Sequence, residues 1–462
     1  IWKKVLSLGN QLNDMVTQLD VIPFQKPCTG VIELPGSKSI SNRALLLSCF
    51  NKSAVTTLFN ILKSEDVEIM IAALKSLGVN IKTNWAEKTL SIEGCAGIAP
   101  VKEQNIQVGN AGTVARFLTA WLLIQKNSSY HLDGTLEMRK RPIRQLLQCF
   151  TTGGIKIDYK IEDGHFPFSM KTENFHCEEW SIDASKSSQI LSAVMMISPL
   201  LSNKGIINFT TGTVSRPFLE ITRKMIKTFS GDERFKCDIS DDRIEIFGSY
   251  SRKNNFKYEI EPDATAASYF LTLPQVVGGS CELTGIHENM LQGDVKYTQI
   301  LKENGAEILR GSTGYISRNH GNNKLNGGEY NFNDISDTFL TLAAISPLMR
   351  NPLTIRGIEH TRNQECDRVD AMAKELTKLG QLVEQTPDSI HIIPDLNKLK
   401  RLASRKVIVE TYEDHRVAMS FGILGSFNLL QNGKPWLTIS DPMCCSKTFP
   451  EFFNVLSSIR ES

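Results

Sequence analysis

The chain has no long hydrophobic run, and its basic and acidic residues nearly balance. No apolar stretch in the 462 residues approaches the roughly 18–20 residues that a membrane-spanning helix needs. The 52 basic and 50 acidic residues leave a formal net charge of only +2. General attraction to nucleic acid or to an anionic membrane is therefore not expected. Any anion site has to arise from the local placement of Lys and Arg side chains.

The ten cysteines lack the spacing of a metal site or of a disulfide framework. No Cys-x-x-Cys pair occurs, so free thiols in a reducing cytoplasm are the expected state. The first 20 residues mix Lys, Asn, Asp and Gln with apolar residues and do not resemble a signal peptide. Ile1 is not an initiator methionine, which suggests a segment of a longer polypeptide.

What the chain does contain is a series of helix starts suited to anions. Residues 34–47 read Leu-Pro-Gly-Ser-Lys-Ser-Ile-Ser-Asn-Arg-Ala-Leu-Leu-Leu and predict a turn followed by an apolar helix. The unpaired N–H groups of a first helical turn favour an anion, and Lys38 and Arg43 add two charges. A nucleotide P-loop does not fit, because Ser37 separates Gly36 from Lys38. An ordinary capped helix with solvated charges is the simpler alternative.

This pattern, a Gly- or Ser-rich polar loop followed by an apolar helix, recurs along both halves of the chain. Further examples begin near residues 64, 108, 133 (with Pro142 as a first helical residue), 185, 215, 262, 293, 333, 364, 413 and 446. Short β-branched strands separate the helices. The repetition predicts an α/β fold with two similar domains. Parallel helices would aim their N-termini at one surface, and two such surfaces would form an anion-binding cleft between the domains.

The chain is too long for one compact core, so we expect more than one domain. The polar stretch 249–261 marks the expected break. We predict an N-terminal tail or linker at 1–25, a first α/β domain at 37–255, and a second made of 26–36 together with 256–462.

The charged residues at the helix starts indicate the kind of chemistry. The basic set is Lys38, Arg43, Arg116, Arg141, Arg368, Arg416 and Lys447. Asp337, Glu365 and His415 occupy similar positions and add a capacity for proton transfer. A single Lys or Arg is more often a solvated surface charge, and Glu365 could simply complement a helix dipole. Seven cations at helix starts favour one shared site for a multiply charged metabolite.

The motifs, in order, resemble those of the 5-enolpyruvylshikimate-3-phosphate (EPSP) synthase family from about Val31 to Leu456. They are Leu-Pro-Gly-Ser-Lys-Ser-Ile-Ser-Asn-Arg, Gly-Asn-Ala-Gly-Thr, Arg-Pro-Ile, Ser-Ser-Gln, Asp-Arg at 367–368, Asp-His-Arg at 414–416 and Lys-Thr-Phe-Pro. The amino-acid sequences of residues 115–119, 411–421 and 445–448 are most similar to those of the corresponding domain of the fungal pentafunctional arom polypeptide. Such an origin would also explain the start at Ile1.

The resemblance implies transfer of the enolpyruvyl group of phosphoenolpyruvate to the 5-hydroxyl of shikimate 3-phosphate, with release of phosphate. It implies addition and elimination through a tetrahedral intermediate, in the shikimate pathway of aromatic amino acid biosynthesis. Two domains of repeated βαβαββ units would close over the substrates. No metal or organic cofactor, nucleic acid or membrane is implied. The enzyme would be cytoplasmic and covalently linked to other shikimate-pathway domains.

The resemblance also assigns residues. Shikimate 3-phosphate would be held by Lys38, Ser39, Arg43, Ser187, Ser188, Gln189, Ser215, Asp337 and Gln364. Phosphoenolpyruvate would be held by Lys38, Asn110, Gly112, Arg141, Arg368, Arg416 and Lys447. The catalytic candidates are Lys38, Asp337, Glu365 and His415, and the sequence does not assign the individual proton transfers.

Four positions depart from the family pattern. Gln364 stands where a Lys is usual, His360 where Asn is common, Phe218 where Tyr is frequent, and Glu137 where Arg is common. Loss of a charge-assisted hydrogen bond at 364 would cost about 1.5–3 kcal/mol of binding free energy. We expect affinity to be adjusted rather than abolished.

Two alternative functions remain. A UDP-N-acetylglucosamine enolpyruvyl transferase shares the expected fold but typically has a reactive Cys just before its Arg-Pro. Residues 135–140 contain none, and Cys149 falls inside a predicted helix. The second alternative is a non-catalytic anion-binding domain.

Overall fold

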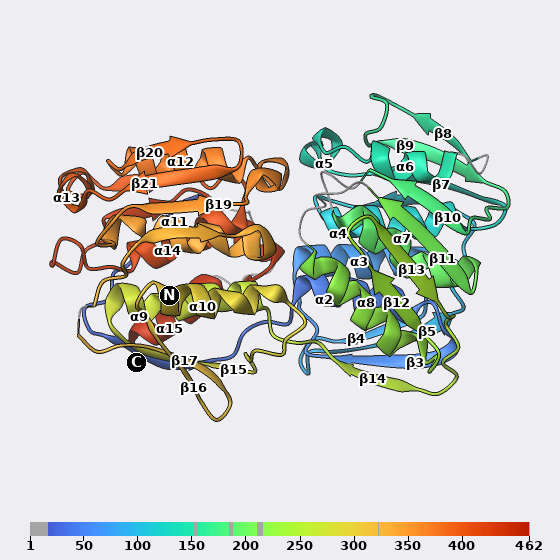
Figure 1. The fold of residues 1–462 in the computed structure, drawn as a ribbon, viewed down its shortest axis with the longest axis horizontal. Coiled ribbons are helices and arrows are strands. Elements are labelled where there is room, and N and C mark those ends of the chain that lie inside the picture. Colours follow the sequence, from blue (N-terminus) through green and yellow to red (C-terminus); the bar gives the residue numbers. More distant parts are fainter. Residues whose placement is uncertain (1–16, 152–154, 184–187, 210–215, 322, 462) are drawn as a thin grey trace, which may run out of the picture.

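The computed structural model describes residues 17–151, 155–183, 188–209, 216–321 and 323–461. Figure 1 shows two lobes side by side, each built of helices and small sheets. Two hydrophobic cores correspond to them, one formed within residues 40–260 and the other by residues 21–34 together with 264–459. The chain therefore passes between the cores twice. The predicted α/β fold of repeated units is confirmed.

The strands of the described residues form six small sheets on one plan, a parallel pair followed by antiparallel neighbours. In one of them, β6 (Glu103–Gln107) lies parallel to β7 (Ser128–Asp133). Strand β9 (Phe168–Thr172) runs antiparallel between β7 and β8 (Lys156–Tyr159). Helix α4 (Gly112–Leu123) connects the parallel pair, because parallel neighbours need a crossover. This arrangement is the βαβαββ unit.

The remaining elements follow the same order. The first half adds α2 (Lys38–Ser48), β3 (Lys52–Phe59), α3 (Glu65–Ser76), β4 (Ile81–Asn84), β5 (Thr89–Cys95), α5 (Leu136–Lys140), α6 (Arg144–Thr151), β10 (Glu179–Ile182), α7 (Ser188–Leu201), β11 (Lys204–Phe209), α8 (Pro217–Ser230), β12 (Lys236–Ile239), β13 (Arg243–Phe247) and β14 (Phe256–Glu259). The second half holds β1 (Leu19–Asp20), β2 (Cys28–Ile32), α9 (Ala264–Val277), β15 (Gly279–Thr284), η1 (Gly293–Lys296), α10 (Tyr297–Glu303), β16 (Glu307–Arg310), β17 (Gly314–Asn319), β18 (Gly328–Asn331), η2 (Asn333–Thr338), α11 (Phe339–Ala344), η3 (Ser346–Leu348), β19 (Leu353–Arg356), η4 (Glu359–Asn363), α12 (Arg368–Lys378), β20 (Leu382–Gln385), β21 (Ser389–Ile393), α13 (Leu396–Ala403), β22 (Val407–Val409), α14 (His415–Gly425), β23 (Leu437–Ile439), η5 (Pro442–Lys447) and α15 (Phe452–Glu461).

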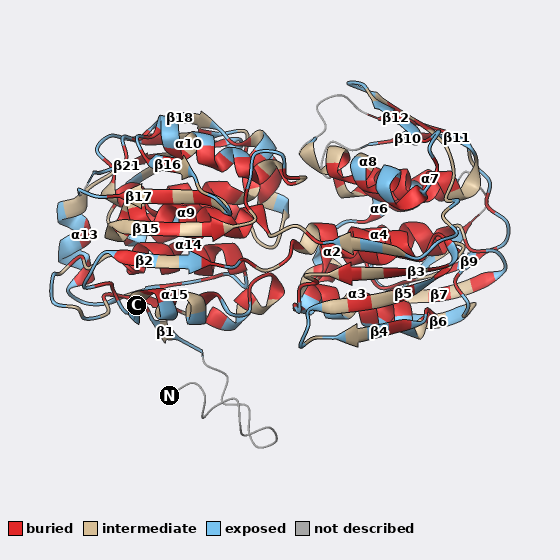
Figure 2. Cartoon of the chain, turned by 90° about the horizontal axis from the view of Figure 1, so that it is seen from below, coloured by how far each residue is buried: buried red, intermediate tan, exposed pale blue. Residues whose placement is uncertain are grey.

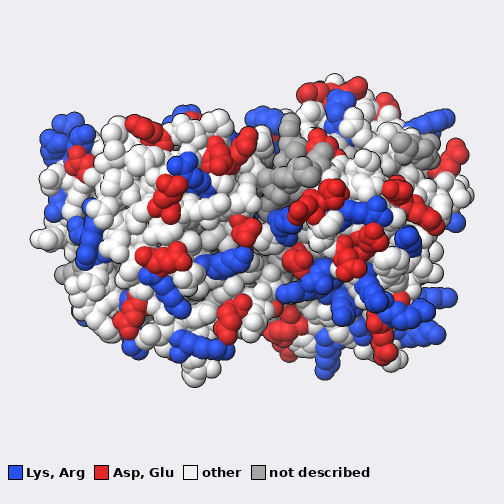
Figure 3. Space-filling model, in the orientation of Figure 1, with Lys and Arg blue, Asp and Glu red and all other residues white. Residues whose placement is uncertain are grey.

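Helices occupy the inside of each lobe and the sheets cover them, as the distribution of buried residues in Figure 2 shows. Every residue of α4 and of α14 is buried. A helix that is apolar on all sides has to lie inside a core, which explains Trp121 at 0% exposure. Lys, Arg, Asp and Glu are interspersed over both lobes in Figure 3, consistent with the small net charge. No helix among the described residues is long and apolar enough to cross a membrane.

In each half of the molecule, one sheet includes a strand that comes from a distant part of the sequence. Strand β14 lies parallel to β3, and β2 lies parallel to β15. Residues 256–259 therefore pack with the first core, whereas we expected the second domain to begin at 256. The two crossing segments also pair directly, since the Ser37 N–H donates to the Glu261 carbonyl at 2.8 Å and the Asp263 N–H donates to the Pro35 carbonyl at 2.8 Å.

The expected tail at 1–25 is partly a piece of the second core. Strand β1 pairs antiparallel with β23, and Val21 and Phe24 are only 3% and 5% exposed. The backbone of this segment is held against β23, since the Val21 N–H donates to the Leu437 carbonyl at 3.0 Å. Residues 1–16 lie outside the described part.

Two predicted helix starts are displaced. Helix α5 begins before Arg141 because Thr135 caps it, accepting a hydrogen bond from the Met138 N–H at 3.3 Å. Arg141 and Pro142 therefore lie between α5 and α6, and Pro142 is not a first helical residue. The last helix, α15, begins only after Pro450, and Lys447 ends the preceding short 3-10 helix.

Gly36 is required where the chain first crosses between the cores. A Cβ at this position would lie 2.0 Å from the backbone oxygen of Asn60. We expect Gly36→Ala to lower the free energy of unfolding by about 1–3 kcal/mol, because backbone atoms have to shift. Urea denaturation measures this change. The matched control is Gly30→Ala, whose Cβ would meet its nearest atom at an ordinary 3.5 Å. Equal stability of the two variants would contradict the argument.

Candidate active site

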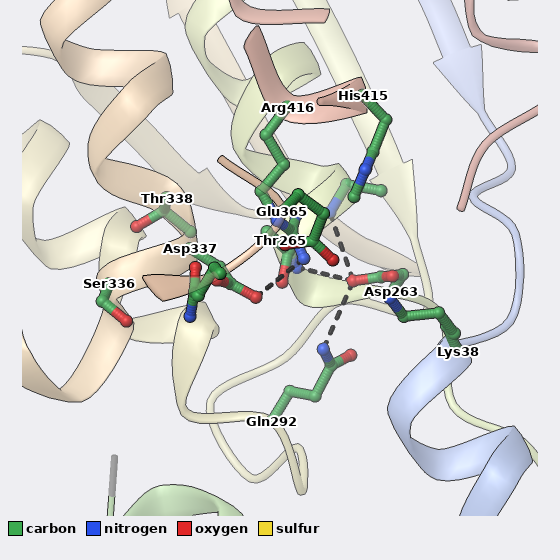
Figure 4. Close-up of polar contacts among 12 residues, drawn as sticks. Lys38, Asp263, Thr265, Gln292, Ser336, Asp337, Thr338, Glu365, His415 and Arg416 are labelled. Atoms are coloured by element: carbon green, nitrogen blue, oxygen red, sulfur yellow. Dashed lines mark hydrogen bonds and ion pairs between the residues drawn. The ribbon is translucent and has the colours of Figure 1, made fainter. Parts of the chain in front are cut away.

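A cavity of about 160 Å³ lies between the two halves and is lined by charged residues from both. The first half supplies Lys38, Ser39, Arg43, Thr113, Arg116, Arg141, Pro142, Gln145, Ser188, Gln189, Ile190 and Phe218. The second half supplies Asp337, His360, Asn363, Gln364, Glu365, Arg368 and Arg416. Figure 4 shows Lys38 of the first half in the same region as Asp337, Glu365 and Arg416 of the second.

Arg368 is the centre of the second-half side of this cavity. Its side chain is 2% exposed and forms ion pairs with Asp414 at 2.7 Å, Glu365 at 2.8 Å and Asp337 at 2.9 Å. It also donates to the Gln364 side-chain oxygen. Burial by itself would lower the pKa of Arg368, but the carboxylates, Asp414 first, raise it. An arginine held in this way is a fixed positive charge.

The two cavity carboxylates are held in their ionised form. Glu365 pairs with Lys447 at 3.1 Å as well as with Arg368. Burial would raise the pKa of Glu365, but Lys447 and Arg368 bring it well below its usual range. Asp337 accepts from Arg416 at 2.7 Å, and Arg416 and Arg368 lower its pKa against the effect of burial. Both groups are therefore ionised, and either would accept a proton only if the field of the neighbouring cations weakened.

Two lysines lie where these carboxylates face the first half, and their charges act on Glu365. Lys38, the first residue of α2, lies 3.2 Å from Asp66. Lys447 donates to the backbone oxygen of Asn110 at 3.0 Å. Burial would lower the pKa of Lys447, but Glu365, followed by Asp66, raises it. The side chain of Lys447 therefore carries its charge across the boundary between the two halves.

The three first-half arginines that line the cavity have no carboxylate partner among the described residues. Arg43 is 1% exposed, and within this part of the chain it donates to oxygens without charge, Thr222 Oγ1 at 2.8 Å, the Ser39 carbonyl at 3.0 Å and Ser192 Oγ at 3.1 Å. Burial lowers the pKa of Arg43 to about 9. This shift reflects the free-energy cost of burying a cation that has no anion beside it. An anionic ligand would relieve that cost.

Arg116 and Arg141 likewise form no ion pair among the described residues. Burial, followed by the charge of Arg141, lowers the pKa of Arg116 to about 9, and the charge of Glu365 opposes this shift. Nη1 of Arg141 is buried and has no hydrogen-bond partner among the described residues. A Cβ on Gly112 would lie 2.8 Å from Nη2 of Arg141, so a glycine leaves room for this guanidinium over the start of α4. The side chain of Arg141 is thus positioned with a free donor.

Most of the predicted site residues meet at this cavity. Lys38, Ser39, Arg43, Arg141, Ser188, Gln189, Asp337, Gln364, Glu365, Arg368 and Arg416 line it. Three others do not line it. Lys447 pairs with the lining residue Glu365, Gly112 lies against Arg141, and Asn110 accepts a hydrogen bond from Lys447. Ser187 and Ser215 lie outside the described residues.

His415 does not line the cavity, although it was predicted as a catalytic residue. It is 0% exposed, and neither ring nitrogen has a hydrogen-bond partner among the described residues. The charges that act on its ring include those of Lys38 and Glu365, so the buried ring lies close to the cavity groups without lining the cavity. Burial, and then Arg416 and Lys38, lower the pKa of His415 well below its usual range, which keeps the ring neutral.

Sequence reasoning missed the carboxylates that hold the cations in place. Asp66 pairs with Lys38, and Asp414 both caps α14 and pairs with Arg368. Both stand at helix starts in the sequence, which was the available signal. Among the departures from the family pattern, Glu137 pairs with Lys140 on the surface, and Arg139 is bound to Asp133. The His360 Nε2 lies 2.8 Å from Ser336 Oγ.

The fold and the cavity define a two-lobed α/β protein with an enolpyruvyl transferase-like architecture. The superposition with EPSP synthase of Acinetobacter baumannii covers 96% of this chain and 98% of that one, with a TM-score of 0.75 at 21% identity. The enolpyruvyl transferase NikO of Streptomyces tendae has a TM-score of 0.69 at 13% identity, covering 96% and 97%. These likenesses establish the fold.

Sequence relatives identify the family. Residues 23–456 match the family described as EPSP synthase (3-phosphoshikimate 1-carboxyvinyltransferase), and the chain belongs to this family. The 3-phosphoshikimate 1-carboxyvinyltransferase of Opitutus terrae is 41% identical, over 96% of this chain and 97% of that protein. The enzyme of that name from Proteus mirabilis is 37% identical, over 93% and 96%.

The neutral buried ring of His415 predicts a pH dependence of stability. The folded-state pKa is lowered, so the unfolded chain binds the proton first as the pH falls through about 6.5. Between pH 7.5 and 5.5, His415 should cost the protein about 1–1.5 kcal/mol of unfolding free energy. We expect the unfolding free energy of the His415→Asn variant, measured by urea denaturation, to fall by that much less between pH 7.5 and 5.5. The same pH dependence in both proteins would contradict the assignment.

Proposed function

We propose that this protein transfers the enolpyruvyl group of phosphoenolpyruvate to the 5-hydroxyl of shikimate 3-phosphate and releases phosphate. The observation that carries the proposal is the set of first-half cavity arginines, which form no ion pair among the described residues. Arg43 and Arg116 are buried, and Arg141 is half-buried with its Nη1 atom buried. They share one cavity with the second-half cations. Each substrate carries a phosphate and a carboxylate, which supply the missing negative charge.

The residues divide into two binding sets. Ser39, Arg43, Ser188, Gln189, Asp337 and Gln364 would hold shikimate 3-phosphate, together with Ser187, Ser215 and Lys38. Arg141, Arg368, Arg416 and Lys447 would hold phosphoenolpyruvate, with Lys38, Asn110 and Gly112 beside them. An ion pair at about 4 Å gains about 4 kcal/mol at an effective dielectric near 20, against about 1 in water. Excluding water from this cavity would therefore strengthen several contacts together.

In the reaction, carbon 3 of phosphoenolpyruvate gains a proton while the 5-hydroxyl oxygen bonds to carbon 2 and loses its own proton. The tetrahedral intermediate then loses the proton from carbon 3, and its carbon–oxygen bond to phosphate breaks. Asp337, Glu365 and Lys38 are the groups at the cavity able to carry these protons. Arg368 and Lys447 stabilise the negative charge of the leaving phosphate.

Glu365 is suited to a change of protonation during this cycle. Its low pKa depends on Lys447 and Arg368. When an anionic substrate engages the same two cations, their field at Glu365 weakens and its pKa rises. A carboxyl group whose pKa responds to substrate in this way can accept a proton in one step and return it in another. His415 is left out of the proton transfers because of its position.

The bacterial relatives carry one activity name each, so they give no support to a link with the arom polypeptide or with other pathway domains. We place the enzyme in the cytoplasm, because multiply charged phosphorylated substrates do not cross a bilayer unaided. Cell fractionation with an antibody to the chain would test this location.

The decisive assay follows phosphate release from phosphoenolpyruvate. We expect release that requires shikimate 3-phosphate and that UDP-N-acetylglucosamine cannot support. Arg141→Gln should lower kcat/KM about 10- to 150-fold, because a charge-assisted hydrogen bond is lost. Lys82→Gln, on the exposed side of β4, is the control and should leave kcat/KM unchanged. Release with the nucleotide sugar would support the sister enzyme, and no release with either acceptor would support a binding domain.

Gln364 predicts weaker binding of shikimate 3-phosphate than a lysine would give. Its side-chain oxygen accepts from Arg368, and the residue lines the cavity. A lysine at 364 would add a charged donor near the substrate, so Gln364→Lys should lower the KM for shikimate 3-phosphate about tenfold. Gln364→Met is the matched control for loss of the contact with Arg368. An unchanged KM in Gln364→Lys would show that this position does not set the affinity.

A further inference from the structure

A second cavity, of about 900 Å³, lies beside the first crossing of the chain between the halves. One wall comes from the first half, residues 60–72 together with the turn at 85–88, and the other from the second half, residues 33–35 and 446–455. We call it the hinge crevice. It shares no lining residue with the active-site cavity. Figure 2 shows α3 and α15 on the two sides of the boundary between the lobes.

The walls of the hinge crevice are largely apolar. Leu62, Ile69 and Trp85 line it from the first half, and Phe449 and Val455 line it from the second. Ile69, Trp85 and Val455 are only half-buried. Small-molecule sites combine such apolar walls with a few polar groups that orient the ligand. A flat apolar body is the shape that would cover both walls.

Charges of both signs stand on the first-half wall of the crevice. Lys63, Lys88, Glu65 and Glu68 are exposed, and none of them lies within 4.0 Å of an opposite charge among the described residues. The Lys63 ammonium lies 5.9 Å from the Trp85 ring centroid. The lysines suit a carboxylate and the glutamates an ammonium group. A small molecule with both charges at one end satisfies this wall.

Ser64 is a second polar feature of the crevice. It lines the cavity between Lys63 and Glu65, is 2% exposed, and its hydroxyl has no hydrogen-bond partner among the described residues. As the N-cap residue of α3 it makes no side-chain capping bond. A buried hydroxyl without a partner carries an energetic cost that a ligand carboxylate can remove.

Both walls carry active-site residues on their other side. On α3, Asp66 pairs with Lys38, and Ile69 packs so closely on Gly109 that a Cβ there would lie 2.4 Å from Ile69 Cδ1. Gly109 precedes Asn110, which accepts from Lys447. In the opposite wall, Ser446 and Phe449 lie beside Lys447 in the chain. A ligand that displaces either wall therefore moves contacts around the proposed phosphoenolpyruvate site.

We propose that the hinge crevice binds an aromatic α-amino acid and that its occupancy weakens the binding of phosphoenolpyruvate. The aromatic ring packs against Trp85 and Phe449. The carboxylate lies near Lys63, and the ammonium group lies near Glu68. The effect on phosphoenolpyruvate rests on the proposed function, whereas binding itself does not.

Calorimetric titration of the full chain tests the binding. L-Tryptophan and L-phenylalanine should each bind at one site per chain. Phenylacetate lacks the ammonium group and phenethylamine lacks the carboxylate, so each should bind about two- to fivefold more weakly. L-Alanine lacks the ring and should bind at least about tenfold more weakly. No binding of the two aromatic amino acids, or equal binding of phenethylamine, would overturn the proposal.

A pair of variants tests the location. Trp85→Ala should weaken L-phenylalanine binding roughly tenfold, because the ring loses one apolar wall. The control is Lys82→Ala. Lys82 lies on the neighbouring strand β4, is exposed and does not line the crevice, so this variant should bind L-phenylalanine as the wild type does. The amide NMR shifts of Glu68 and Phe449 in the free variant would show that it is folded, and their change on addition of L-phenylalanine would show that the crevice is occupied. Unchanged affinity in Trp85→Ala would place the ligand elsewhere and refute the site.

Steady-state kinetics test the coupling. Saturating L-phenylalanine should raise the KM for phosphoenolpyruvate about two- to fivefold with little change in kcat, and this effect should disappear in Trp85→Ala. Measured binding with an unchanged KM would overturn the coupling. An enzyme without phosphate release would overturn the proposed function instead, and would leave the calorimetric result standing.

Discussion

Charge balance around Arg368 is the constraint on which the site depends. Its guanidinium is surrounded by Asp414, Glu365 and Asp337, so the second half supplies its own compensation. The first-half arginines that line the cavity, such as Arg43, have no such partner among the described residues. A buried charge without a partner is costly, and the anionic groups of the proposed substrates would relieve this cost.

The crossing of the chain explains how these two charge sets come together. Strands β2 and β14 are exchanged between the halves, and their ends pair at residues 35–37 and 261–263. Lys38 follows this junction at the first residue of α2 and reaches Asp66. The junction therefore lies between the two cavities, since Lys38 lines the active-site cavity and Pro35 and Gly36 line the hinge crevice.

Much of the site could be predicted from helix starts, because a local motif fixes which residues begin a helix. Lys38, Glu365, Arg368 and Arg416 meet at the cavity as expected. The partners Asp66 and Asp414 were missed as such, since a motif does not show which distant residue will face it. His415 is buried and does not line the cavity, which depends on how distant segments pack, and its catalytic role stays a prediction.

The sequence by itself determined the repeated units, the positions of most helix starts and the family. Periodicity, capping residues and motif order are local properties that every segment carries with it. Only the tertiary structure decided that residues 19–24 and 256–259 join cores far from them in sequence, which cations are neutralised, and that a second cavity lies behind α3. These outcomes depend on contacts between distant segments, because burial and charge compensation exist only after the chain has packed.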